Sequence, residues 1–181
     1  QHPGRINGQD LEKRDRPAGI LFFNEEGDEC GGLIYYGKTE EGQTASGMSF
    51  TMDQYKEDQV LQIINSEAYS DGEEKIARGI LISDLPTGSD LLTRMARVEE
   101  IKKQLETMSK EEAEQLMSEI GNSLGRQRRL FLGRTSGNNS GLYLSGPDGK
   151  QKLKIYVDKN GTPKLEVMDK EGNYKDILEN E

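Results

Sequence analysis

Residues 142–172, LYLSGPDGKQKLKIYVDKNGTPKLEVMDKEG, decide the fold because they repeat one short pattern three times. Each repeat is an alternating apolar and polar run, followed by an acidic or amide residue and glycine. The closing glycines, Gly149, Gly161 and Gly172, are 12 and 11 residues apart. Glycine readily adopts the positive φ that a tight hairpin turn requires. The stretch therefore predicts an antiparallel meander of short β-hairpins.

The alternation also predicts that this meander has one apolar and one solvated face, because successive side chains of a strand point to opposite sides. An apolar face needs a cover, which a helical pair, the N-terminal hairpin or another copy of the chain could supply. We expect a homo-oligomer, because short meanders with exposed edges often associate. The predicted apolar face contains Leu153, Ile155, Val157, Leu165 and Val167, and the solvated face contains Lys152, Lys154, Tyr156, Lys164 and Glu166.

The hairpin pattern recurs nearer the N-terminus. The apolar runs Ile20–Phe23 and Leu33–Tyr36 flank a glycine-rich connector, which predicts a hairpin. Met48–Met52 alternates and predicts a further strand. Gln59–Asn65 and Lys75–Ser83 lie on either side of Asp71-Gly72, a dipeptide typical of a two-residue turn. These runs predict that the sheet continues through the first half of the chain.

The remaining segments define the expected domain organisation. Residues 1–18 are polar and lack periodicity, which predicts an extended arm, and residues 38–47 predict a loop. Ser89 is the predicted N-cap of a helix whose apolar residues run from Leu91 to Met108. Ser109 and Glu112 form a capping box that predicts a second helix. We therefore expect one mainly β (α+β) domain, residues 19–181, with an αα-hairpin inserted at about 89–123.

Composition limits the possible functions. Asp and Glu number 33 against 24 Lys and Arg, and the net charge of −9 disfavours general nucleic-acid binding. The sequence contains no apolar run long enough to predict a membrane span. Cys30 is the only cysteine, which excludes an intrachain disulfide and a thiolate zinc site. The single histidine, His2, lies in the polar arm, so the sequence predicts no nucleophile and histidine pair.

Two acidic segments, Asp28–Gly32 and Asp53–Gln59, are the candidates for a ligand or hydrolase site. Paired carboxyl groups about 5–10 Å apart in a cleft can act as acid and base. This hypothesis predicts that the segments meet and that one carboxyl group has a raised pKa. The alternative is a set of solvated turns. The D-x-x-G turns fail the register of a calcium loop, so neither metal nor cofactor is predicted. The candidate side chains are Asp28, Glu29, Cys30, Asp53, Gln54, Tyr55 and Asp58.

A basic cluster follows the predicted helices. Arg126, Arg128, Arg129 and Arg134 are a candidate site for an anion or an acidic partner. The alternative is that they pair with acidic helices within the chain.

Three stretches carry a resemblance to a known group of sequences. FFNEEGDECGGLIYYG (22–37), FTMDQYKEDQ (50–59) and residues 129–172 together resemble a family of uncharacterised bacterial proteins. Members carry an acidic-Cys-Gly-Gly hairpin, a D-Q-Y-x-x-D-Q segment and D-x-x-G hairpins. The family has no assigned activity, so the resemblance implies no catalytic role. It implies a bacterial origin, and with it we expect a cytoplasmic location, with export left open.

The sequence favours a non-enzymatic β-rich structural or binding module that self-associates. Its alternatives are a hydrolase or small-ligand enzyme at Asp28–Gly32 and Asp53–Gln59, and an anion or acidic-partner site at Arg126–Arg134.

Overall fold

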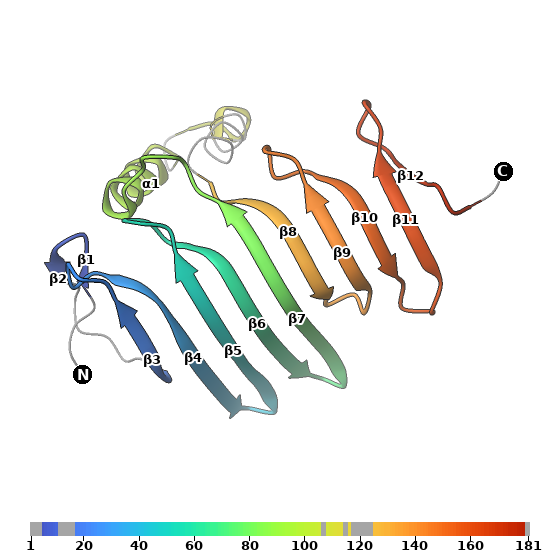
Figure 1. Ribbon diagram of the computed structural model, residues 1–181, viewed down its shortest axis with the longest axis horizontal. Helices are drawn as coiled ribbons and strands as arrows, with labels where there is room; N and C mark the ends of the chain where they lie inside the picture. The colour runs from blue at the N-terminus through green and yellow to red at the C-terminus, as the bar shows by residue number, and fades with distance from the viewer. Residues whose placement is uncertain (1–4, 11–16, 106–107, 114–115, 117–124, 180–181) are drawn as a thin grey trace.

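The computed structural model describes residues 5–10, 17–105, 108–113, 116 and 125–179. Its main feature is a ten-stranded antiparallel sheet in which every strand pairs with the next strand in sequence (Figure 1). The chain is therefore mainly β, and the predicted meander is confirmed. No helix among the described residues is long and apolar enough to cross a membrane.

The sheet extends from β3 to β12, and a small separate hairpin precedes it. That hairpin occupies residues 5–10, within the predicted extended arm. Its strands are β1 (Arg5–Ile6) and β2 (Gln9–Asp10). The sheet strands are β3 (Ala18–Phe23), β4 (Glu29–Glu40), β5 (Gln43–Asp53), β6 (Gln59–Ser70), β7 (Glu73–Asp84), β8 (Gln127–Arg134), β9 (Ser140–Ser145), β10 (Gln151–Val157), β11 (Pro163–Met168) and β12 (Tyr174–Asp176).

Most of the hairpin loops share one backbone pattern. In the loops that begin at Asn24, Thr135, Gly146, Asp158 and Asp169, the first N–H donates to the carbonyl four residues later, and the fourth N–H donates back to the first carbonyl. The fourth residue has a positive φ in each, which is 71°, 88° and 91° at Gly149, Gly161 and Gly172. The turn role that the sequence predicts for these three glycines is confirmed.

The predicted loop at residues 38–47 is wrong. β4 and β5 remain paired as far as Glu40 and Gln43, and the turn consists of Glu41 and Gly42 alone, with φ of 51° and 81°. Two successive positive φ values match the twist of a tight hairpin. The ends of β4 and β5 are polar on both sides of the sheet, so the apolar alternation that marks other strands is missing.

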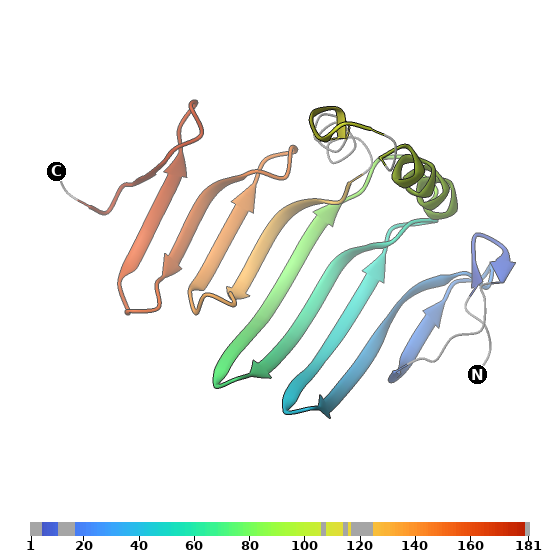
Figure 2. The ribbon, with the colours of Figure 1, turned by 180° about the vertical axis from the view of Figure 1, so that it is seen from behind.

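The sheet is a single layer, because no described element lies over either side of it in Figure 1 or Figure 2. Its two sides are defined by direct register partners, and we name them face A and face B. Face A contains the row Phe50, Ile63, Ile80, Leu132, Leu142, Ile155 and Leu165. Face B contains the row Gln62, Leu81, Phe131, Tyr143, Lys154 and Glu166.

A small core lies on face B. Leu81, Phe131 and Tyr143 are buried there, and Ile64 and Tyr156 pack against them. The ring centroids of Phe131 and Tyr143 are 5.8 Å apart, as are those of Tyr143 and Tyr156. Such spacing is favourable for aromatic pairs. The middle of face B, from β6 to β10, is therefore covered by side chains of the sheet itself.

Helix α1 (Leu91–Leu105) sits beyond the strand ends in both views and covers neither face (Figures 1 and 2). Its N-cap is Asp90, whose Oδ1 accepts the Thr93 N–H at 3.0 Å. The predicted N-cap, Ser89, instead donates its hydroxyl to the Pro86 carbonyl at 2.6 Å and closes the preceding turn. Ser89 and Asp90 both suit a cap, and the sequence pattern alone selected the wrong neighbour.

The predicted capping box of the second helix is confirmed. The Ser109 hydroxyl donates to the Glu112 carboxylate at 2.7 Å, and the Glu112 N–H donates to the Ser109 hydroxyl at 3.4 Å. Residues 110–113 are helical. Residues 114–115 and 117–123 of the predicted helix lie outside the described residues.

Candidate functional site

Face A is an apolar surface that no described element covers. It extends from β3 to β11, and its exposed members retain 37–59% of their accessible surface. The predicted apolar face of β10 and β11 is part of it. Ile155, Val157 and Val167 are exposed there, whereas most residues of the predicted solvated face are half-buried. The exposed members are Ile20, Phe22, Tyr35, Met52, Ile63, Ile80, Ile82, Leu132, Ile155, Val157 and Val167.

The total accessible surface area of the chain is larger than expected for a compact monomer, as an uncovered face requires. The chain exposes 12402 Å², whereas a compact monomer of 20.3 kDa exposes about 8,800 Å² by the usual size scaling. The difference of about 3,600 Å² exceeds the roughly 800 Å² that each partner contributes to a typical specific interface. Only six apolar side chains in the described residues are buried, and none of them completely. The chain therefore exposes more surface than a compact monomer of its size, and the open side chains of face A are part of that excess.

The two acidic segments predicted as a ligand site do lie side by side. β4 and β5 pair there, with Gly31 opposite Met52 and Gly32 opposite Thr51. All four register shifts of the sheet lie at this same end of the strands. Such bulges redirect side chains next to a turn. Cys30 is a half-buried free thiol in this region.

Asp53 is the carboxyl group with an unusual environment at this end. Burial raises its pKa to about 6, and the neighbouring carboxylates of Asp58 and Glu29 add to the shift, while Arg126 opposes it. Its Oδ1 atom is buried without a hydrogen-bond partner among the described residues. The hypothesis that one carboxyl group in these segments has a raised pKa is thus met by Asp53.

The other candidates in these segments make structural contacts. Asp28 accepts the Gly8 N–H at 2.7 Å and so fixes the β1–β2 hairpin. Gln54 donates to the Pro86 carbonyl at 3.4 Å, and Tyr55 donates to Glu26 at 3.0 Å. Asp58 accepts the Gln59 N–H and the guanidinium of Arg126 at 2.8 and 2.6 Å. These side chains therefore connect separate segments of the chain.

The sequence analysis missed the buried ion pair between Glu57 and Arg94. Arg94 donates to both Glu57 oxygens at 2.8–3.1 Å, and the Glu57 side chain is fully buried. Burial pushes the Glu57 pKa up, but the hydrogen bonds from Arg94 and Ser89 outweigh it, so the pKa is lowered. A bidentate arginine contact of this kind is among the strongest charged hydrogen bonds.

The turn that contains Glu57 differs from the other loops in its sequence. QYKED, residues 54–58, lacks the glycine or asparagine found at the fourth position elsewhere, and Lys56 takes the positive φ of 60°. The Lys56 carbonyl then accepts the Leu91 N–H at 2.9 Å and the Asn7 side chain at 3.2 Å. This turn therefore holds both the start of α1 and the β1–β2 hairpin, as a polar clamp (Asn7, Lys56, Glu57, Arg94).

The four predicted arginines do not form one cluster. Arg126 and Arg128 line a depression at the same end of the sheet as the polar clamp. Arg129 pairs with Asp84. Arg134 lies at the other end of β8, where it donates to the Ile76 carbonyl at 2.7 Å. The alternation of the strand and its register shift separate residues that are neighbours in sequence.

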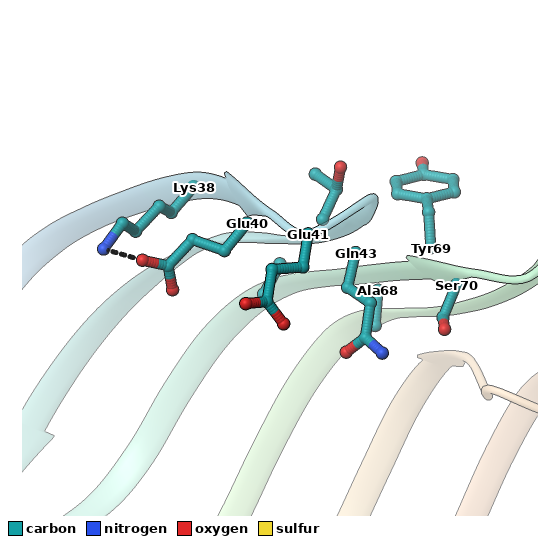
Figure 3. Close-up of a pocket in the computed structure, with 9 residues that line it drawn as sticks. Lys38, Glu40, Glu41, Gln43, Ala68, Tyr69 and Ser70 are labelled. Carbon is teal, nitrogen blue, oxygen red and sulfur yellow. Dashed lines mark ion pairs between the residues drawn. The ribbon is translucent and has the colours of Figure 1, made fainter.

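A second depression lies at the opposite end, where the β4–β5 and β6–β7 hairpins project (Figure 3). In the close-up, Glu40, Gln43 and Ser70 point to one side of the sheet and Tyr69 to the other. On that other side, hydrogen bonds from Arg78, Asn65 and Tyr69 lower the pKa of Glu67 to about 2. These contacts connect neighbouring strands, so this end of the sheet is held by its own polar groups.

Comparison of the chain with protein-family models, with curated proteins and with solved structures finds no match. The resemblance described from the sequence therefore stays a prediction. In the described residues, no group of three His, Cys, Asp or Glu side chains is arranged to hold a metal ion.

Proposed function

We propose that this chain is a non-catalytic structural module that self-associates through face A. The observation that carries the proposal is the uncovered apolar surface on nine successive strands, β3 to β11. A second copy of the same chain offers the same surface, so two copies can pack face to face about a two-fold axis. Two sheets packed in this way form a sandwich with a shared apolar core.

The energetics are compatible with a second copy as the cover. A typical specific interface buries roughly 800 Å² on each partner, and the hydrophobic effect stabilises it in proportion to the apolar area removed from water. Association costs about 4–15 kcal/mol before side-chain ordering and desolvation are counted. The flat shape of the sheet lets many strands contribute at once. A stable dimer is therefore compatible with the apolar surface available.

The polar end of the sheet supports a structural role. Three carboxylates there bind other segments of the chain. Asp28 binds the β1–β2 hairpin, Glu57 binds α1, and Asp58 binds the segment before β8. These contacts hold segments at the ends of the strands, and none of them involves a side chain of face A named above.

The test is the solution mass of the chain by light scattering after gel filtration. We expect a dimer for the wild type, and a monomer for Leu132→Asp and Ile155→Asp, whose side chains are 48% and 46% exposed on face A. Asn160→Asp, on an exposed turn next to β10, adds the same charge away from the face and should leave the dimer intact. A monomeric wild type with a normal circular dichroism spectrum would contradict the proposal.

A further inference from the structure

Face B carries a basic depression of about 520 Å³ where β6, β7 and β8 meet the β9–β10 turn. Its floor includes Gln62 and Leu81, which are register partners on that face. The start of β8, the turn residues 148–150 and the first residue of β10, Gln151, also line it. The volume lies within the range of small-molecule sites. The depression is on the opposite side of the sheet from the apolar surface, so it is independent of self-association.

The charges in this depression do not balance. Arg126, Arg128 and Lys150 line it, against the single carboxylate of Asp148. Arg126 is bound by Asp58, and Asp148 lies 3.8 Å from Lys152. Neither Arg128 nor Lys150 has a carboxylate partner among the residues that the structure describes. With Arg126 paired to Asp58, the depression keeps a small positive excess, which Arg128 and Lys150 carry.

The neutral groups of the depression can also donate hydrogen bonds to an anion. Gln62, Gln127 and Gln151 contribute amides, and Ser83 and Ser145 contribute hydroxyls. Gly149 has a φ of 71°, and a Cβ atom there would lie 2.4 Å from the Gln127 side chain, so the missing side chain lets Gln127 fit into the wall. The lining therefore combines two guanidinium groups and one ammonium with several neutral donors.

We propose that this depression binds a phosphate group, either as free phosphate or on a small polar phosphomonoester. A phosphate dianion has three strongly accepting oxygens and suits several cationic and neutral donors together, whereas a carboxylate has two oxygens and one charge. Leu81 is the one apolar residue of the lining, which disfavours an apolar ligand. Arg126, held at 2.6 Å by Asp58, is already oriented at the rim.

The experiment is a titration of the ¹⁵N-labelled chain with inorganic phosphate and, separately, with glycerol 1-phosphate, at constant ionic strength in chloride. We expect saturable NMR shifts confined to the Gln62, Gln127 and Gln151 side-chain amides and the Gly149 N–H. Arg128→Ala and Lys150→Ala should each weaken binding about tenfold, because each removes one charged contact. Both residues are exposed, so neither variant should disturb the fold.

Lys170→Ala is the matched control, because Lys170 is exposed on the β11–β12 turn, away from the depression. It should bind like the wild type. Tighter binding of the phosphomonoester than of phosphate would assign the remaining volume to the organic part, and equal binding would assign a site for free phosphate. Linear shifts without saturation, or unchanged affinity in Arg128→Ala, would overturn the proposal. Neither result bears on the solution mass, so the two proposals fail separately.

Discussion

Faces A and B of the same sheet are built from the same alternating strands, yet they differ in what covers them. On face B, stacked aromatic rings and ion-paired long side chains lie over their neighbours, as where Lys154 and Tyr156 both contact Glu166. On face A, the exposed apolar side chains of β6 to β11 are branched aliphatic ones, which stand beside one another and leave large exposed areas. Long side chains can cover a sheet from within, whereas branched aliphatic ones need a second layer.

Two adjacent residues of β8 give the strongest test of the difference between the faces, because one side chain lies on each face. Phe131→Ala removes a buried ring from face B and should lower the free energy of unfolding by about 3–5 kcal/mol. Leu132→Ala, on face A and 48% exposed, should cost the isolated monomer about 1 kcal/mol or less. Urea unfolding followed by circular dichroism, at concentrations where the chain is monomeric, measures both. Equal losses at the two positions would show that the faces are equivalent.

The ion pair between Glu166 and Lys154 on face B should make a smaller contribution to stability. Glu166→Gln removes the charge that binds Lys154 at 2.8 Å, and should cost about 1 kcal/mol at pH 7. Hydrogen bonds from Lys154 lower the Glu166 pKa. The ionised Glu166 therefore contributes to stability at pH values above its pKa in the unfolded chain, which is near 4.5. This contribution is lost as the pH falls through its lower pKa in the folded chain.

Denaturant unfolding of the wild type and of Glu166→Gln at pH 7 and pH 3 measures this difference. The two proteins should differ clearly at the higher pH and less at the lower one. Glu171→Gln, on an exposed turn, should change stability by less than about 0.5 kcal/mol at either pH. A Glu166→Gln variant as stable as the wild type at pH 7 would mean that the ion pair does not help to cover face B.

The sequence predicts the sheet well because alternation and turn glycines are local properties. The tail hairpins and the β6–β7 hairpin follow directly from them. The apolar partners of face A in β10 and β11 were also predictable, since alternation assigns residues to a side. What local pattern cannot predict is a contact between distant segments, such as Glu57 with Arg94, 37 positions apart. The absent glycine in QYKED was the one sequence signal of that clamp.

The same limit explains the errors near the strand ends. Residues 38–47 pair as strands because their partners continue, although their own side chains are polar on both sides. The four arginines were grouped by sequence, but strand alternation and length send Arg134 to the other end of β8. The meeting of Asp28–Gly32 with Asp53–Gln59 was expected only as a hypothesis, and strand pairing brings the segments together.

The predicted effect of Asp53 on stability is similar in size to that of Glu166 and has the opposite sign. Its pKa is raised to about 6 from 3.8, so the folded chain binds the proton more tightly than the unfolded chain. The stability that Asp53 contributes is then full below about pH 4 and is lost as the pH rises through about 6. At pH 7 the half-buried carboxylate is ionised beside Asp58 and Glu29, which costs free energy.

Asp53→Asn should therefore stabilise the chain by about 1 kcal/mol at pH 7 and by much less at pH 4.5, because the wild-type carboxyl group is then mostly protonated. Denaturant unfolding at the two pH values measures the difference, with Asp71→Asn on an exposed turn as the matched control. A gain that is the same at both pH values would arise from the shape of the side chain and not from its charge. In that case the charge of Asp53 would not contribute to the free energy of unfolding.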